Sequence, residues 1–93
     1  MRQVTVNRAL QLAHGLDCVG GSYKRMVLLV MAAYASGNGR VCTSQKRLRN
    51  ATELGSQAFM RIAGELETDG WVRREGPGFT VSISKMEANQ RVL

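Results

Sequence analysis

The sequence predicts a mainly helical α+β fold in which several short helices precede one small β-hairpin. Two patterns carry this prediction. The first is a set of apolar residues at the three-and-four spacing of one buried helix face: Phe59, Ile62, Ala63 and Leu66. The second is the alternation of apolar and polar residues over Phe79–Ser84, which is typical of a half-buried strand. Gly76–Gly78 supplies the turn of the hairpin.

The chain length of 93 residues is enough for one hydrophobic core. We therefore expect a single domain, with its core over residues 22–84, an N-terminal extension over residues 1–21 and a tail over residues 85–93. A chain of this size buries only about 60–65% of its unfolded surface, so dimerisation would add stability.

The N-terminal extension is predicted to hold one short helix. Residues Arg2–Val6 alternate in polarity, and Asn7 then offers a side-chain oxygen that can cap a helix. The apolar face of that helix would be Ala9, Leu10, Ala13 and Leu16. The loop Asp17–Gly21 follows, because two consecutive glycines weaken a helix. The extension either packs on the domain or forms part of a dimer contact, and the sequence leaves both open.

The longest apolar segment predicts a helix over Tyr23–Ala35, capped by Ser22. One stripe of it holds Tyr23, Val27, Val30, Met31 and Tyr34, and further apolar residues extend nearly all round. Such a helix is central to a fold, or is covered on its second side by another chain, which would favour a homodimer. The uninterrupted apolar run is about half of the ~20 residues that cross a membrane, so we expect no membrane span.

Two more helices and a tight turn are predicted over Thr43–Val72. Thr43 or Ser44 caps the first helix, whose apolar face would be Leu48 and Ala51. We place the turn at Glu53–Gly55 and assign a positive φ to Gly55.

The second of these helices begins at Ser56 and is predicted to end at Gly70, because glycine adopts the left-handed conformation that follows many helices. Trp71 and Val72 begin a strand, and Trp71 is predicted to be part of the core. The tail Lys85–Leu93 is predicted to be frayed, or to be a short helix that presents Met86 and Val92 to a partner.

This order of elements resembles the winged helix-turn-helix domain of bacterial regulators and of phage and plasmid replication initiators. The matching residues are Ser44, Gln45, Leu48, Leu54, Phe59, Ala63, Leu66, Gly70, Trp71 and Val72. Arg49 stands where the family usually has a small residue, and Glu53 stands where it usually has glycine. The resemblance implies a three-helix core plus a hairpin wing, and a short strand at Arg40–Cys42 beside that wing.

The positive charge of the chain is concentrated in its first half. Residues 1–50 hold eight Lys or Arg and one acidic residue, a net charge of +7, whereas residues 51–93 hold five basic and six acidic residues, a net charge of −1. An asymmetric basic surface attracts polyanions, although the same charge would also arise from a need for solubility.

Double-stranded DNA is the polyanion that the resemblance implies, with the N-terminal end of the second helix in the major groove. That end carries Ser56, Gln57, Met60 and Arg61, of which Gln57 could read an adenine edge and Arg61 a guanine edge. The other end carries Glu65, Glu67 and Asp69, which would repel phosphate.

Further contacts are expected from the neighbouring elements. Lys46, Arg47 and Arg49 are candidates for phosphate binding, and we select the first two because position 49 normally faces inward. The predicted contact set also includes Ser44, Gln45, Arg73 and Arg74. Arg73 and Arg74 should point to opposite faces of their strand, so only one of them contacts DNA.

The sequence offers no pattern for catalysis, for a metal or for a cofactor. His14 is the single histidine and has no Ser, Cys or Asp partner at a recognisable spacing. The two cysteines, Cys18 and Cys42, lack neighbours at metal-ligand spacing, and we expect buried or half-buried thiols in a reducing cytoplasm. A disulfide between them is the alternative.

Three functions are compatible with these observations. The first is a DNA-binding transcriptional regulator of bacterial, phage or plasmid origin that acts as a homodimer. The second is a replication-initiation or plasmid-partition component that binds repeated sites and recruits proteins through Tyr23–Ala35 or the tail. The third is a winged-helix adaptor that binds only protein. RNA binding is less favoured, because interleaved exposed aromatic residues are missing.

Overall fold

The computed structural model of the chain describes residues 7–16 and 19–90. This part of the chain forms a mixed α+β fold of five helices and a two-stranded antiparallel hairpin. Its elements are α1 (Arg8–His14), α2 (Ser22–Ala33), α3 (Gln45–Thr52), α4 (Ser56–Thr68), β1 (Val72–Glu75), β2 (Gly78–Val81) and α5 (Ile83–Ala88). The predictions for Arg2–Val6, Asp17, Cys18 and Val92 fall outside the described residues.

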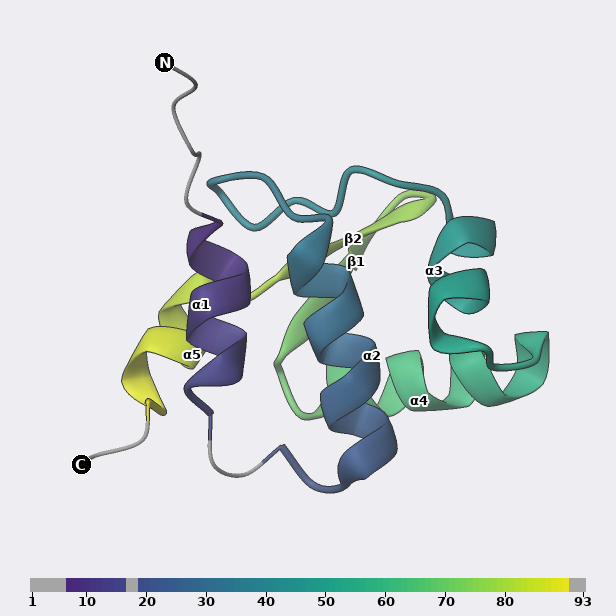
Figure 1. Cartoon of the computed structure of the whole chain (residues 1–93), viewed down its shortest axis with the longest axis horizontal. Coiled ribbons are helices and arrows are strands. Elements are labelled where there is room, and N and C mark those ends of the chain that lie inside the picture. The colour runs from purple at the N-terminus through teal and green to yellow at the C-terminus, as the bar shows by residue number, and fades with distance from the viewer. Residues whose placement is uncertain (1–6, 17–18, 91–93) are drawn as a thin grey trace, which may run out of the picture.

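Helix α2 is the centre of the fold. It contacts α1, α3, α4 and β2, and its residues Val27, Met31 and Ala32 are fully buried. Figure 1 shows α1 and α5 on one side of α2 and α3 on the other side. The second apolar side of this helix is therefore covered by the same chain. Of the two alternatives that the sequence left open, a central helix or a helix covered by another chain, the structure shows the central helix.

Three details of the α2 prediction were wrong. Ser22 is the first helical residue, since Gly21 takes the N-cap position and no side chain caps the helix. The helix ends at Ala33, because Ala35 pairs with Val41 where the chain reverses direction. Tyr23 does not belong to the buried stripe, because its position at the end of the helix leaves it 62% exposed.

Helix α1 is tied to both of its neighbours by side-chain amides. Asn7 caps α1 through its Oδ1, and its Nδ2 donates to the carbonyl oxygens of Ala32 and Ala33 at the end of α2. At the other end, Gln90 Nε2 donates to the Leu12 carbonyl at 2.8 Å. The N-terminal helix thus packs on its own domain, which is one of the two alternatives that the sequence left open for the extension.

Helices α3 and α4 form a pair joined by residues 53–55. Ser44 caps α3 by accepting from the backbone N–H of Arg47 at 3.2 Å, as predicted. Leu48 is buried as expected, but Ala51 is exposed and Thr52 takes the buried position. The Thr52 hydroxyl is satisfied there, because it donates within α3 to the Leu48 carbonyl at 3.0 Å.

The turn between these helices differs from the prediction. Glu53 has a left-handed φ of 58°, whereas Gly55 has a φ of −67° and is the N-cap of α4. The chain reverses direction at the residue directly after α3, so Glu53 takes the positive φ. Gly55 has an ordinary negative φ.

The end of α4 follows the prediction closely. Gly70 has a φ of 86°, its N–H donates to the Glu67 carbonyl, and the Trp71 N–H donates to the Leu66 carbonyl. This pair of bonds is the Schellman motif, which satisfies carbonyls that the end of a helix leaves free. Trp71 is buried, and the predicted stripe of Phe59, Ile62, Ala63 and Leu66 is buried as well.

The hairpin pairs Val72 with Val81 and Arg74 with Phe79 on the face that packs against the helices. The segment 39–41 lies along the other edge of β2, where Arg40 bridges Thr80 and the Val41 N–H donates to the Phe79 carbonyl at 2.9 Å. Gly39 permits this close approach, because a Cβ there would lie 2.5 Å from the Val81 carbonyl oxygen. The strand expected near Arg40–Cys42 is present as this short pairing.

The predicted strand over Phe79–Ser84 is shorter than expected. The chain leaves the sheet after Val81, and Ser82 caps helix α5 by accepting from the Lys85 N–H. Ile83 still packs against the core, but it does so from a helix. Met86 is fully buried among the core residues, so it is not presented to a partner, which corrects the prediction for the tail.

Replacing Glu53 with glycine should stabilise the protein. A non-glycine residue in the left-handed region costs about 1 kcal/mol, so Glu53→Gly should raise the free energy of unfolding by about that amount. Urea denaturation measures the change. The control is Glu53→Ala, which removes the carboxylate but keeps the Cβ. Equal gains in both variants would assign the effect to the carboxylate and contradict the backbone explanation.

Truncating Met86 tests whether α5 belongs to the core. Met86→Ala should lower the free energy of unfolding by about 2–4 kcal/mol, because it leaves a cavity in a fully buried site. The adjacent variant Glu87→Ala removes an exposed ion pair and should change it by no more than about 0.5 kcal/mol. Similar values for the two variants would contradict the observed packing.

Candidate nucleic-acid interface

The stripe of α4 that packs on α2 leaves the opposite side of α4 in solvent. Ser56, Gln57 and Arg61 are exposed, as a helix buried on one side requires. Met60 is half-buried and packs against the hydrophobic core, so it has less surface to offer than the sequence suggested. Arg61 lies 3.5 Å from Glu65 one turn further along, and both side chains are largely exposed. Such a surface pair contributes little energy and is readily exchanged for another partner.

Helix α3 presents two cations that no described carboxylate pairs with. Lys46 and Arg47 are exposed, and neither lies within ion-pair distance of an acidic side chain in residues 7–16 and 19–90. The Ser44 hydroxyl is exposed at the start of the same helix, where it acts as the cap. These side chains are available to an anion without the loss of an existing salt bridge.

Gln45 connects α3 to the hairpin. Its Nε2 donates to the Pro77 carbonyl in the hairpin turn at 3.3 Å, and the side chain is half-buried. This contact holds the tip of the hairpin beside the beginning of α3. Gln45 therefore has a structural role in the free protein, which the sequence alone did not reveal.

The two arginines of β1 lie on opposite faces of the hairpin, in agreement with the period of a strand. The Arg74 guanidinium lies over the Phe79 ring, 5.3 Å from its centroid, on the face that packs against α4. Phe79 in turn contacts Phe59 of α4 edge-on, with the ring centroids 6.4 Å apart. Arg74 thus lies on the face of the hairpin that packs against α4.

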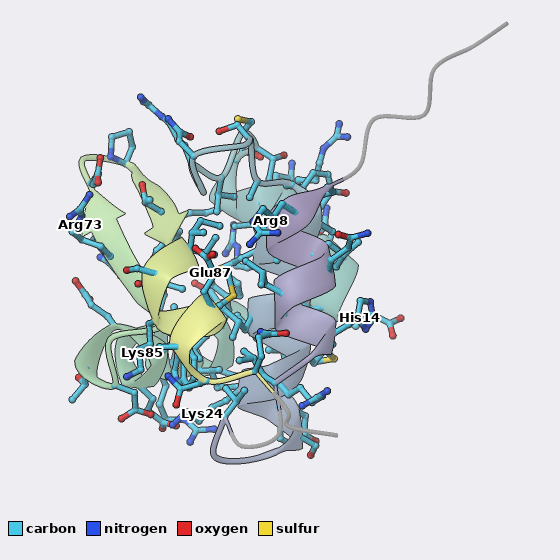
Figure 2. All side chains as sticks on the ribbon, turned by 90° about the vertical axis from the view of Figure 1, so that its left-hand side faces the viewer. Arg8, His14, Lys24, Arg73, Lys85 and Glu87 are labelled. Carbon is cyan, nitrogen blue, oxygen red and sulfur yellow. The ribbon has the colours of Figure 1, made fainter. Side chains whose placement is uncertain are left out.

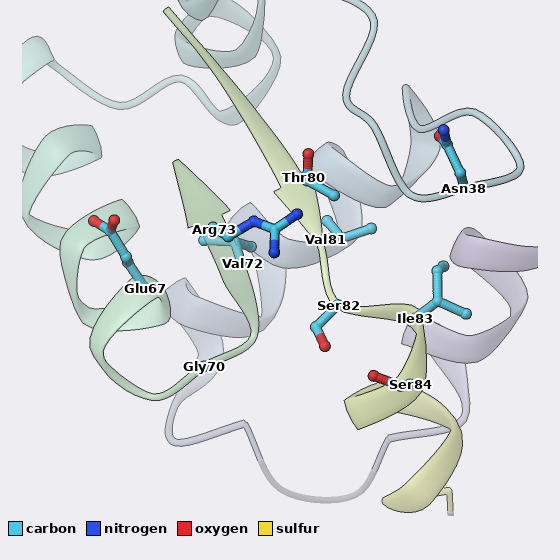
Figure 3. A pocket seen from close by; sticks show the side chains of 10 residues that line it. All are labelled: Asn38, Glu67, Gly70, Val72, Arg73, Thr80, Val81, Ser82, Ile83 and Ser84. Atoms are coloured by element: carbon cyan, nitrogen blue, oxygen red, sulfur yellow. The ribbon is translucent and has the colours of Figure 1, made fainter. Parts of the chain in front are cut away.

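Arg73 lies on the outer face of the hairpin. It is aligned with Thr80 of β2 and Arg40 of the neighbouring segment, and it forms an ion pair with Glu75. It also lines an open pocket of about 560 Å³ beside the end of α4, together with Glu67 and Thr80 (Figure 3). Arg73 therefore lies on the opposite face of the hairpin from Arg74 and already has a carboxylate partner.

The pKa of Glu75 lies below its ordinary value. The hydrogen bond from Arg73, at 2.8 Å from its Nε, is the main cause, and the positive charges of Arg73 and Arg40 add to it. Arg40 was not among the predicted contacts. The bridge between Arg40 and Thr80 places Arg40 on the outer face of the hairpin. In the sequence, only the short strand expected at residues 40–42 indicated that Arg40 would lie beside the hairpin.

Asp69, at the end of α4, serves the scaffold. The Asp69 carboxylate pairs with Lys24 of α2, and its backbone carbonyl accepts from Lys85, whose Nζ also lies 4.6 Å from the centre of the Trp71 ring. Figure 2 shows Lys24 and Lys85 near one another, away from Arg73, and Arg8 of α1 beside Glu87 of α5. The ion pairs of the described chain thus neutralise cations outside α3.

Cys42 is a free, exposed thiol, so the prediction of a buried or half-buried thiol was wrong for this cysteine. Cys42 lies outside the core because its neighbour Val41 takes the inward position where this segment runs beside β2.

Within the described residues, no group of three His, Cys, Asp or Glu side chains is arranged to hold a metal ion. No helix of the described chain is long and apolar enough to cross a membrane.

Comparison with protein-family models, with curated proteins and with solved structures finds no match to this chain.

The ion pair at the hairpin predicts a change in the titration of Glu75. Arg73→Ala should raise the pKa of Glu75 toward its ordinary value, since the main hydrogen-bond donor is removed. Carbon-13 NMR of the carboxyl group measures it. Because the folded pKa is the lower one, the pair stabilises the fold above the unfolded pKa, and this contribution is lost as the pH falls through the folded pKa. Arg74→Ala, the matched control, should leave the pKa of Glu75 in place.

Proposed function

We propose that this chain is a winged helix-turn-helix protein that binds double-stranded DNA sequence-specifically and regulates transcription. In this proposal α2, α3 and α4 are the three-helix core, the hairpin is the wing, and α4 enters the major groove by its N-terminal end. The observed order of elements supports it, with a short strand segment after α2, a helix pair joined by a three-residue turn, and a hairpin packed on α4.

The observation that carries the proposal is the contrast in charge pairing around α3 and α4. Lys46, Arg47 and Arg74 have no carboxylate partner within the described residues, and neither has Arg40 on the outer face of the hairpin. Arg8, Lys24 and Arg73 each have a carboxylate partner, and Arg61 has only the exposed pair with Glu65 on its own helix. Cations that stay unpaired next to an exposed polar helix end favour a phosphate backbone as their partner. Gln57 and Arg61 then supply hydrogen-bond donors of the kind that distinguish base edges in the major groove.

The assigned roles follow from these positions. Lys46, Arg47 and Arg74 bind phosphates, and the Ser44 and Ser56 hydroxyls add contacts at the helix starts. Gln57 and Arg61 read bases, and the half-buried Met60 adds an apolar contact beside them on α4. Gln45 positions the wing through Pro77, and Arg73 is left out of the interface.

A homodimer and a cytoplasmic location are part of the same proposal. The small size of the chain favours a dimer, and two half-sites would then give an inverted repeat. Because α1 covers the second side of α2, a dimer must use another surface than the one that the sequence suggested. A footprint separates the proposed role from replication initiation or plasmid partition, since an array of direct repeats would indicate the latter.

A protein-binding adaptor is the second candidate, and Tyr23 is the observation that favours it. This side chain is 62% exposed, and it borders a shallow hollow with Leu54 and Ala58. The variant in which Lys46, Arg47 and Arg61 become Glu decides between the two. If the protein is an adaptor, the variant should still bind its protein partner, and the wild-type protein should show no affinity for DNA.

The DNA-binding test uses the full chain and duplexes selected from a random library, with affinity measured by fluorescence anisotropy over a range of salt concentrations. If each protomer of a dimer contacts about four phosphates, the slope of log affinity against log salt should be about −7. Replacing Lys46 and Arg47 with Glu should weaken binding about a hundredfold or more and make the slope less negative. Gln57→Ala should instead relax the sequence preference with little change in slope.

The control for this test is Arg8→Glu, which reverses an exposed charge on α1 and should leave the slope nearly unchanged. Equal effects of Arg8→Glu and of the α3 variant would mean that only net charge matters, and would contradict an interface at α3 and α4.

A further inference from the structure

Tyr23, in the first turn of α2, is the one large apolar side chain that the described part of the chain leaves exposed. Its exposed fraction of 62% means that a molecule outside the chain can reach it. The side-chain hydrogen bonds of this turn come from Lys24 and Arg25, and Tyr23 takes part in none of them. The Tyr23 hydroxyl is therefore free to donate to an acceptor that is not part of the chain.

Tyr23 borders two shallow hollows that it shares with Arg61 of α4. The first hollow, of about 280 Å³, is also lined by Glu65, whose carboxylate repels an anion. The second hollow, of about 230 Å³, is lined by Leu54 and Ala58 and by no acidic residue. Arg61 is the one charged residue of the second hollow, so the charge there favours an anion.

The second hollow lies beside the end of α4 that is proposed to enter the major groove. Leu54 precedes the helix, and Ala58 is its third residue. Each residue of an α-helix is rotated by about 100° from the one before, so Ala58 lies about 100° from Gln57 and about 60° from Arg61. Tyr23 therefore lies beside the proposed base-reading face of α4.

The dimensions of the groove decide what Tyr23 would meet. An α-helix with its side chains is about 10–12 Å across, and the major groove of B-DNA is about 12 Å wide. One helix therefore fills the groove, and a side chain that a second element holds beside that helix reaches the edge of the groove, where the phosphates lie. Tyr23 belongs to α2, so it would meet a phosphate and not a base.

We propose that the Tyr23 hydroxyl donates a hydrogen bond to a phosphate of the DNA backbone, in the hollow that it shares with Arg61. This inference rests on the proposed DNA binding, and it gives the exposed ring a role other than the docking of a protein partner. Tyrosine is among the side chains that donate to phosphate oxygens. Because the hydroxyl is neutral, the contact fixes the position of α4 on the duplex without adding to the salt dependence or to the sequence preference.

The test is Tyr23→Phe in the full chain, which removes the hydroxyl and keeps the ring. Affinity for the selected duplex at about 100 mM salt should fall about tenfold or more, as expected for one hydrogen bond to a charged acceptor. The salt slope, the sequence preference and the Tm should stay as in the wild type. The matched control is Tyr34→Phe, which removes the other tyrosine hydroxyl of the chain, at the opposite end of α2, and should leave the affinity unchanged.

Ethylation of single phosphates in the duplex identifies the acceptor. At one phosphate beside the bases that α4 contacts, ethylation should weaken binding of the wild type about tenfold more than binding of Tyr23→Phe. This difference is the coupling between the hydroxyl and that phosphate, in the sense of a double-mutant cycle.

Unchanged affinity in Tyr23→Phe, with a wild type that binds DNA, would overturn the role of Tyr23 and leave the proposed function standing. Weaker binding with the same response to ethylation as the wild type at every phosphate would also overturn it, because the hydroxyl would then act through the fold. A wild type that does not bind duplex DNA even at about 50 mM salt would overturn the proposed function and this inference together.

Discussion

The burial of one side of α4 against α2 is the constraint on which the rest of the structure depends. Phe59 and Leu66 have no exposed surface, and Ile62 and Ala63 lie between them on the same side. A helix fixed in this way cannot rotate, so the residues opposite the stripe face solvent in a defined direction. Phe59 also meets Phe79, so the same stripe sets the position of the hairpin. The orientation of Gln57 and Arg61 relative to Arg74 follows from this one packing arrangement.

Local patterns predicted the parts of the fold that depend on local physics. The stripe of α4, the Ser44 cap, the Asn7 cap and the left-handed Gly70 all follow from the spacing and chemistry of adjacent residues. The strand that was expected to continue to Ser84 did not, because Ser82 is equally suited to cap a helix and the alternating pattern cannot distinguish the two. Met86 was placed at a surface because six helical residues are too few to show a periodic face.

The candidate site was less predictable, because it depends on contacts between distant segments. Exposure of Gln57 and Arg61 follows from helix periodicity, but the contact between Gln45 and Pro77 joins residues that are 32 positions apart. The separation of Arg73 from Arg74 follows from strand geometry, and so does the pairing of Arg73 with Glu75, because residues two apart share one face of a strand. No single-residue pattern marks the Nε of Arg49 as unsatisfied, since that property is the absence of an acceptor among the residues that the structure describes.

Two unfavourable features lie within five residues of one another, and both are on the element that the charge pairing singles out. Within the described part of the chain the buried Nε of Arg49 has no partner, and Glu53 takes a backbone conformation that glycine would adopt at lower cost. Elsewhere in the described chain, Asn7 and Ser82 cap α1 and α5 with side-chain oxygens, and the other half-buried cations have acceptors. Natural sequences depart from local rules mainly where function requires it. The occurrence of both departures at the end of α3 therefore supports the same surface that the exposed cations Lys46 and Arg47 indicate.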